Sequence, residues 1–152
     1  MHKHFLCSKH REWLYHNPMA ANHHLADSQE TGQFYCERGR WLEALPYLGC
    51  AYETAELILA TLARDKKTAV ITFTSCAKLL ADTFHKAAME DNSSEIYHLA
   101  QQRLQAEFPL SYQNSTLQAC IRDCIKSLHK GATTQQYKTS INSRQESMLL
   151  LH

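Results

Sequence analysis

The sequence predicts an all-α fold of about six helices, arranged as antiparallel helical hairpins. Three observations predict it. Only four glycines and three prolines occur in 152 residues, which leaves little room for loops. Apolar residues recur at intervals of three and four along most of the chain, as on one face of a helix. Turn signals such as Asn17-Pro18 and Gly39 separate these periodic stretches. We therefore expect long helices joined by short turns.

The first two helices are predicted at about residues 5–16 and 19–38. Asn17-Pro18 ends the first of them, because this dipeptide favours a turn. The first helix carries Phe5, Leu6, Trp13 and Leu14. We expect it to cover the open end of the following hairpin, since stacked hairpins need a cap.

A helical hairpin is predicted around Gly39, which can adopt the left-handed conformation that follows a helix end. Gly32 in the first helix, and Ala44 and Ala51 in the second, are small enough for the two backbones to approach closely. The second helix starts near Trp41, continues to about residue 64 and should kink at its internal proline. Its apolar stripe is Trp41, Leu45, Leu48, Tyr52, Ala55, Leu59 and Leu62.

Residues 25–58 resemble a tetratricopeptide repeat, a helical hairpin of 34 residues. The resemblance rests on Gly32, Tyr35, Gly39, Trp41, Glu43, Ala44, Leu45, Leu48 and Ala51. The proline that usually follows the second helix of this motif is missing. The resemblance implies a right-handed superhelix of hairpins that holds a segment of another protein and carries no chemistry of its own.

In this family the first helix of each hairpin lines a concave surface that holds the partner. The corresponding positions here are Ala26, Gln29, Gln33, Cys36 and Glu37. Members that bind a C-terminal carboxylate use lysine, arginine and asparagine on this surface, and this helix lacks such a set. The two glutamines would instead form hydrogen bonds with the backbone of an extended segment.

A second hairpin is predicted from a helix at about 68–90, a turn at 91–95 and a helix that stops before Pro109. Asn92 and Glu95 have the spacing of a capping box. This hairpin lacks the glycine and aromatic signature, so we interpret it as a degenerate repeat. The equivalent surface positions in this hairpin would be Thr72, Ser75, Lys78 and Leu79.

A final helix is predicted from a capping box at Ser115–Gln118 to Gly131. Residues 1–131 would then form one domain, and residues 132–152 a flexible polar tail with little to bury. The tail ends in the apolar residues Met148, Leu149, Leu150 and Leu151. We expect this tip to dock on a folded surface, either its own or that of a second copy in a homodimer.

Composition and motifs exclude several classes of function. A net charge of +1 gives no general attraction for nucleic acid, and no stretch has the ~20 apolar residues that span a membrane. The N-terminus lacks a signal-peptide core, so we expect a cytoplasmic protein whose six cysteines are small apolar residues. Nucleotide-binding and hydrolase motifs are missing, and no cofactor is predicted. The cluster His2, His4, Cys7 and His10 holds possible metal ligands but matches no established zinc spacing.

The predicted function is a non-enzymatic interaction module, an adaptor or a small chaperone-like protein that binds a peptide or helix of an unidentified partner. The alternative is a helical regulator that self-associates through its apolar tip. Such a regulator could contact nucleic acid locally through Arg122, Lys126 and Lys130, which share one face of a helix. Nucleic-acid binding is otherwise not expected, because the net charge is close to zero.

Overall fold

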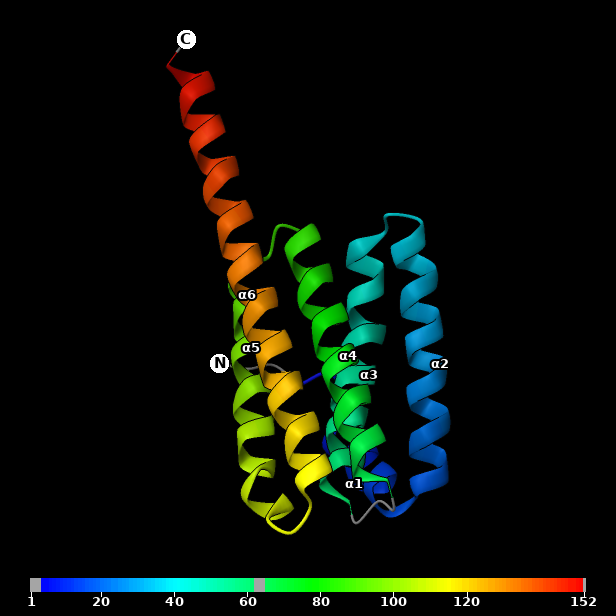
Figure 1. Ribbon diagram of the computed structural model, residues 1–152. Coiled ribbons are helices and arrows are strands. Elements are labelled where there is room, and N and C mark those ends of the chain that lie inside the picture. The colour runs from blue at the N-terminus through cyan, green and yellow to red at the C-terminus, as the bar shows by residue number, and fades with distance from the viewer. Residues whose placement is uncertain (1–3, 62–64, 152) are drawn as a thin grey trace.

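The computed structural model describes residues 4–61 and 65–151, and within these ranges it contains α-helices and one short 3-10 helix but no strand. The six α-helices are α1 (Ser8–His16), α2 (Pro18–Glu37), α3 (Trp41–Ala60), α4 (Lys66–Lys86), α5 (Glu90–Glu107) and α6 (Ser115–Leu150), with the 3-10 helix η1 (Pro109–Ser111) between α5 and α6. Figure 1 shows α2 to α6 as upright rods side by side, with the short helix α1 at their lower end. The predicted all-α class with about six helices is confirmed.

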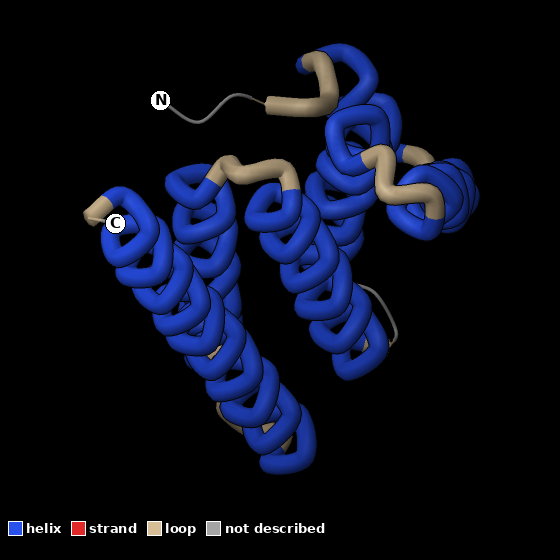
Figure 2. The backbone as a smooth tube through the Cα atoms, turned by 90° about the horizontal axis from the view of Figure 1, so that it is seen from above, coloured by secondary structure: helices blue, strands red, loops and turns tan. Residues whose placement is uncertain are grey.

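The helices form two layers. Helices α2 and α3 pack as one antiparallel hairpin, α4 and α5 as a second, and α6 packs against both α4 and α5. Figures 1 and 2 show α2, α4 and α6 in one layer with α3 and α5 behind them. The short helix α1 packs on α2 and α3. It begins at Ser8 and not near residue 5, so the predicted start was wrong.

The turn of the first hairpin is the one predicted. Gly39 has a φ of +68°, and the amide of Arg40 donates to the carbonyl of Tyr35 at 3.0 Å. This is the Schellman motif, in which a left-handed residue satisfies the last carbonyls of a helix. Helix α3 then continues through Pro46 and ends at Ala60, short of the predicted end near residue 64. The stripe residue Leu62 lies outside the described residues.

The close approach within this hairpin is also confirmed. A Cβ placed on Gly32 would lie 2.4 Å from Cδ2 of Leu48, a separation that no packed structure tolerates. Ala44 and Ala51 on the facing helix are fully buried. The hydrogen at position 32 is therefore what lets Leu48 lie directly against the backbone of α2.

The second hairpin has the same turn, but it lies before the predicted position. Ala88 has a φ of 60°, and the amide of Met89 donates to the carbonyl of Phe84 at 2.8 Å. The prediction of a turn at 91–95 was wrong, and Asn92 and Glu95 lie inside α5. The error has a physical cause, because alanine pays a steric cost in this conformation and gives no turn signal.

Comparison of the two turns reveals an internal repeat of 49 residues (88 − 39). At this offset the three small residues of the first hairpin correspond to Ala81, Ser93 and Ala100, and all three are buried. The second hairpin therefore has the same close helix contact, built with alanine and serine in place of glycine and alanine. Tyr35 corresponds to Phe84, so the aromatic position is kept as well.

Helix α6 differs most from the prediction. Its N-cap is Asn114, whose side chain accepts from the amide of Leu117 at 2.9 Å, and not Ser115. Gly131 does not end the helix. A Cβ at this position would lie 2.9 Å from the ring of Tyr97, so the glycine serves a helix contact with α5. Residues 132–150, predicted as a flexible tail, are helical. Ala132 and Gln135 still contact the bundle, and the end of the helix projects beyond it (Figure 1).

The hydrophobic core runs through α2 to α6, with Tyr52, Phe73 and Leu80 among its largest fully buried side chains. A separate small cluster of Leu6, Leu14 and Ala21 holds the N-terminal segment and α1 against the first hairpin. No helix in the described part of the chain is long and apolar enough to span a membrane.

Candidate binding groove

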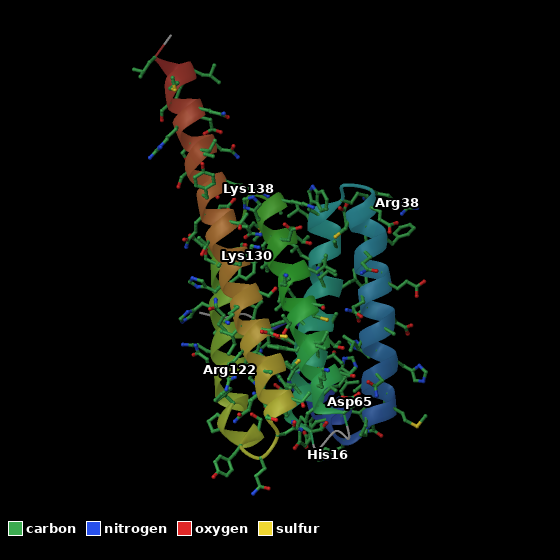
Figure 3. All side chains as sticks on the ribbon, in the orientation of Figure 1. His16, Arg38, Asp65, Arg122, Lys130 and Lys138 are labelled. Carbon is green, nitrogen blue, oxygen red and sulfur yellow. The ribbon has the colours of Figure 1, made fainter. Side chains whose placement is uncertain are left out.

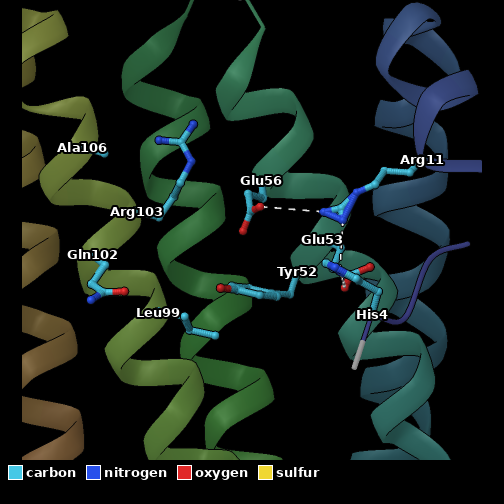
Figure 4. A pocket seen from close by; sticks show the side chains of 9 residues that line it. All are labelled: His4, Arg11, Tyr52, Glu53, Glu56, Leu99, Gln102, Arg103 and Ala106. Atoms are coloured by element: carbon cyan, nitrogen blue, oxygen red, sulfur yellow. Dashed lines mark hydrogen bonds and ion pairs between the residues drawn. The ribbon is translucent and has the colours of Figure 1, made fainter. Parts of the chain in front are cut away.

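A groove of about 390 Å³ lies between α3 and α5, closed at one end by the N-terminal segment and α1. Figure 4 shows side chains reaching into it from both helices and from His4 and Arg11. The groove exists because α3 and α5 belong to successive hairpins and both pack on α4, while they make few contacts with each other. It is lined by His4, Arg11, Tyr52, Glu53, Glu56, Leu99, Gln102, Arg103 and Ala106.

The apolar part of the groove is centred on Tyr52. Its side chain is 2% exposed and its ring stacks on Phe73 at a centroid distance of 5.3 Å. Figure 4 shows the phenol lying across the groove, with its hydroxyl directed toward α5. Burial raises the pKa of Tyr52 well above its usual range, so the hydroxyl remains protonated at neutral pH. It therefore offers a hydrogen-bond donor and acceptor but no charge.

Glu53 holds the N-terminal segment beside the groove. Its side chain is 1% exposed, and its two oxygens accept from consecutive backbone amides, Phe5 at 3.0 Å and Leu6 at 2.7 Å. The ring nitrogen Nδ1 of His4 lies 3.2 Å from the first of these oxygens. Hydrogen bonds to a carboxylate are stronger than those between neutral groups, which offsets the cost of burying the charge.

The same turn of α3 also receives the side chain of Phe5. A Cβ placed on Gly49 would lie 2.2 Å from Cδ1 of the Phe5 ring. The ring therefore occupies the space that any other residue at position 49 would fill. Gly49 and Glu53 are one turn apart, so they hold the side chain and the backbone of one non-helical segment together.

The rim of the groove carries both signs of charge. A guanidinium nitrogen of Arg11 lies 3.9 Å from Glu56, and Arg103 is paired with Glu107 at 2.8 Å. Lys66 lies 3.8 Å from the other oxygen of Glu107. A guanidinium has five donors, and one carboxylate partner does not use them all. Together with Gln102 the rim can donate and accept hydrogen bonds along a polypeptide backbone.

Three of the cysteines, Cys50, Cys76 and Cys120, do not have the properties of nucleophiles. Burial raises the pKa of the Cys50 thiol and raises that of Cys76 to about 12. The pKa of Cys120 is also raised, first by burial and then by the neighbouring Cys124. A thiol with a raised pKa stays protonated and reacts slowly. All six cysteines are free thiols; Cys76 is buried as predicted, four are partly buried, and Cys7 is exposed.

The five residues predicted to form a binding surface on α2 do not all lie on one exposed face. Nε2 of Gln29 donates to Sγ of Cys76 at 3.1 Å, and Sγ of Cys36 lies 3.6 Å from Oγ1 of Thr83, so both side chains face α4. The other three predicted residues, Ala26, Gln33 and Glu37, are exposed. None of the five lines the groove between α3 and α5.

The contact between α2 and α4 recurs one hairpin further along the chain. Lys78, which is 49 residues after Gln29, donates to Oγ of Ser127 in α6 at 2.7 Å. Three of the four equivalent positions predicted on α4, Thr72, Lys78 and Leu79, are partly buried, while Ser75 is exposed. Polar contacts between successive helices of this layer are part of the repeating design.

Sequence reasoning missed the groove between α3 and α5, although two signals were present. Gly49 is an isolated glycine inside a helical pattern, which often marks a close approach of another group. Glu53 is the one ionisable carboxylate in the run from Ala51 to Ala55, all of which is buried. A carboxylate in such a position needs hydrogen-bond donors, and the sequence alone does not show where they come from.

The other predicted site residues lie apart from the groove. Met148 to Leu151 are exposed at the far end of α6, and Arg122, Lys126 and Lys130 are exposed along it (Figure 3 labels the first and last of these three). Of the histidine and cysteine cluster, His2 lies outside the described residues, and His10 packs edge-on against His24. The described residues contain no group of three potential ligands arranged to hold a metal ion.

No protein-family model, curated protein or solved structure matches this chain.

Proposed function

We propose that this protein is a non-enzymatic interaction module that holds a polypeptide segment of a partner protein. The observation that carries the proposal is the docking of the chain's own N-terminal segment. One turn of α3 binds consecutive backbone amides through Glu53 and an aromatic ring against Gly49. Hydrogen bonds to the backbone with a pocket for one side chain are the usual means of peptide recognition.

The groove between α3 and α5 extends from this segment and is the first candidate site for the partner. It combines an apolar floor with donors and acceptors on both rims. The near balance of charge on the rim favours a partner segment with hydrogen-bonding groups and an apolar or aromatic anchor, without a strong net charge. The second candidate is the α2 surface with Ala26, Gln33 and Glu37, the exposed part of the set predicted from the sequence.

The proposal includes a relationship to tetratricopeptide repeat proteins and their right-handed superhelix. Its support is the pair of hairpins with the same turn, the same buried small positions and a constant offset. In solenoids of this kind each hairpin buries its apolar face against the next, and the surface between them is free to bind.

Selection of random linear peptides on the full chain tests the proposal and distinguishes the two surfaces. Gln102→Trp with Ala106→Trp fills the groove from exposed positions of α5, and Ala26→Arg with Gln33→Arg blocks the α2 surface. We expect selected peptides to bind the groove-filled variant at least ~10-fold more weakly than wild type. The α2 variant should bind normally.

Thermal unfolding of each variant provides the folding control. Loss of binding only in the α2 variant would indicate that peptides bind the α2 surface and not the groove. Failure to enrich any peptide, or equal binding by all proteins, would refute the proposed function.

A further inference from the structure

From residue 142 onward, α6 is not packed against any other part of the chain that the structure describes. Lys138 lies level with Arg38 at the end of the bundle where α2 turns into α3, and α6 continues beyond both (Figure 3). Residues 142–151 are all exposed. An isolated helix of this length is marginal in water, so a helix here requires contacts from elsewhere to be stable. We refer to residues 137–151 as the α6 extension.

Apolar side chains on the extension form one stripe. Tyr137, Ile141, Met148 and Leu151, with Arg144 between them, follow intervals of four and three. This is the a/d spacing of a coiled coil over two heptads. Tyr137, Met148 and Leu151 are between 65% and 84% exposed. The stripe lies on the opposite side of the helix from Ile121 and Leu128, which α6 buries in the bundle.

We propose that the α6 extension pairs with the same segment of a second copy, as an antiparallel two-helix coiled coil. In an antiparallel pair each a residue faces a d residue of the partner copy. Tyr137 then faces Met148 of the other copy, and Ile141 faces Arg144, with each contact made twice by the two-fold symmetry. In a parallel pair Arg144 would face its own equivalent, and this like-charge contact disfavours that orientation.

The second copy is favoured as the occupant because the stripe is self-complementary and nearly free of charge. Its length also fits, because the antiparallel orientation places the two bundles at opposite ends of the pair. Four apolar side chains bury about 400 Å² per copy, or about 800 Å² in total. This is below the ~1,200 Å² of a stable specific interface. The dimer is therefore weak and depends on protein concentration.

Sedimentation velocity on the full chain tests the proposal. Concentrations from about 5 to about 500 µM cover the range in which a weak dimer forms. We expect the wild type to shift from one to two copies as concentration rises. Ile141→Glu with Met148→Glu, on the stripe, should remain monomeric. Leu149→Glu with Leu150→Glu, which are equally apolar but off the stripe, should dimerise like the wild type.

A charge-pair experiment tests the orientation. Tyr137→Glu and Met148→Lys should each dimerise more weakly than wild type, and their mixture should associate more strongly than either alone. In a parallel pair each position faces its own equivalent, so a mixture of Tyr137→Glu with Met148→Glu should gain as much association as the mixture with Met148→Lys. In the antiparallel pair only the mixture that joins glutamate with lysine gains.

A wild type that stays monomeric throughout the range would overturn the proposal. The proposal would also be overturned if the on-stripe and off-stripe variants lost dimerisation equally, or if assemblies larger than two copies formed. It would be overturned as well if mixing the two charge variants did not strengthen association. None of these outcomes bears on peptide binding by the bundle, which is measured separately.

Discussion

Replacement of Gly49 by alanine tests whether the Phe5 ring determines the residue at position 49. Within a helix, glycine is about 1 kcal/mol less favourable than alanine, so the substitution alone would stabilise α3 by that amount. Here the added Cβ would lie 2.2–2.4 Å from three atoms of the Phe5 ring. The ring cannot withdraw easily, because Glu53 binds the amides of Phe5 and Leu6.

The magnitude follows from the balance of these two effects. Overpacking in a well-packed site costs about 1–3 kcal/mol. The gain in helix propensity offsets about 1 kcal/mol of this cost. In the wild-type background, Gly49→Ala should therefore lower the free energy of unfolding by about 0–2 kcal/mol. In a Phe5→Ala background the clash is gone, and the same substitution should stabilise the protein by about 1 kcal/mol.

Urea denaturation of the four proteins in this cycle gives the free energies of unfolding. We expect a coupling of about 1–3 kcal/mol between positions 5 and 49, with a change of sign for Gly49→Ala. Gly39→Ala serves as the control, because a Cβ there meets no atom within 4 Å and the cost arises only from its positive φ. Its effect should be the same in both backgrounds. If Gly49→Ala has one effect regardless of residue 5, the docking of Phe5 on α3 is wrong.

Four further predictions concern stability. Ala88→Gly should raise the free energy of unfolding by about 1 kcal/mol, because Ala88 has a φ of 60°; Ala87→Gly, at a φ of −84°, should not. Glu53→Gln should lower it by about 1–3 kcal/mol, because an amide has one acceptor oxygen for two backbone donors. Gly32→Leu should lower it by about 1–3 kcal/mol or more through overpacking against α3. The pKa of His24 is lowered, first by burial and then by the nearby His10. The unfolded chain therefore binds more protons than the folded chain, and the free energy of unfolding falls as the pH drops through about 6.5. His24→Gln should make that pH dependence shallower.

Urea denaturation measures all four effects, the last as a series between pH 5 and 8. Equal effects of glycine at positions 87 and 88 would contradict the left-handed turn. Wild-type stability in Glu53→Gln would mean that the N-terminal segment does not depend on this carboxylate. An unchanged pH slope without His24 would assign the titration to another group.

The sequence by itself determined the all-α class, the approximate positions of six helices and the turn of the first hairpin. The repeating apolar intervals, the turn at Gly39 and the small residues facing each other around it are local signals, so they could be read from neighbouring residues. The same local rules failed at Ala88 and Gly131. An alanine there takes the conformation that glycine usually provides, and a glycine serves a contact with Tyr97 instead of ending the helix. The Gly131 contact depends on packing between distant segments, and Ala88 adopts a conformation that alanine takes only at a steric cost.

Only the tertiary structure decided where a partner segment could bind. Gln29 and Cys36 occupy surface positions by sequence, yet the stacking of α4 on the first hairpin turns them into contacts between helices. From sequence alone, Glu53 and Gly49 have no evident role within a largely apolar helix. Their role follows from contact with the N-terminal segment, which is more than 40 residues away in sequence. Local periodicity fixes each helix and its buried face, but a groove between two helices depends on which helices become neighbours.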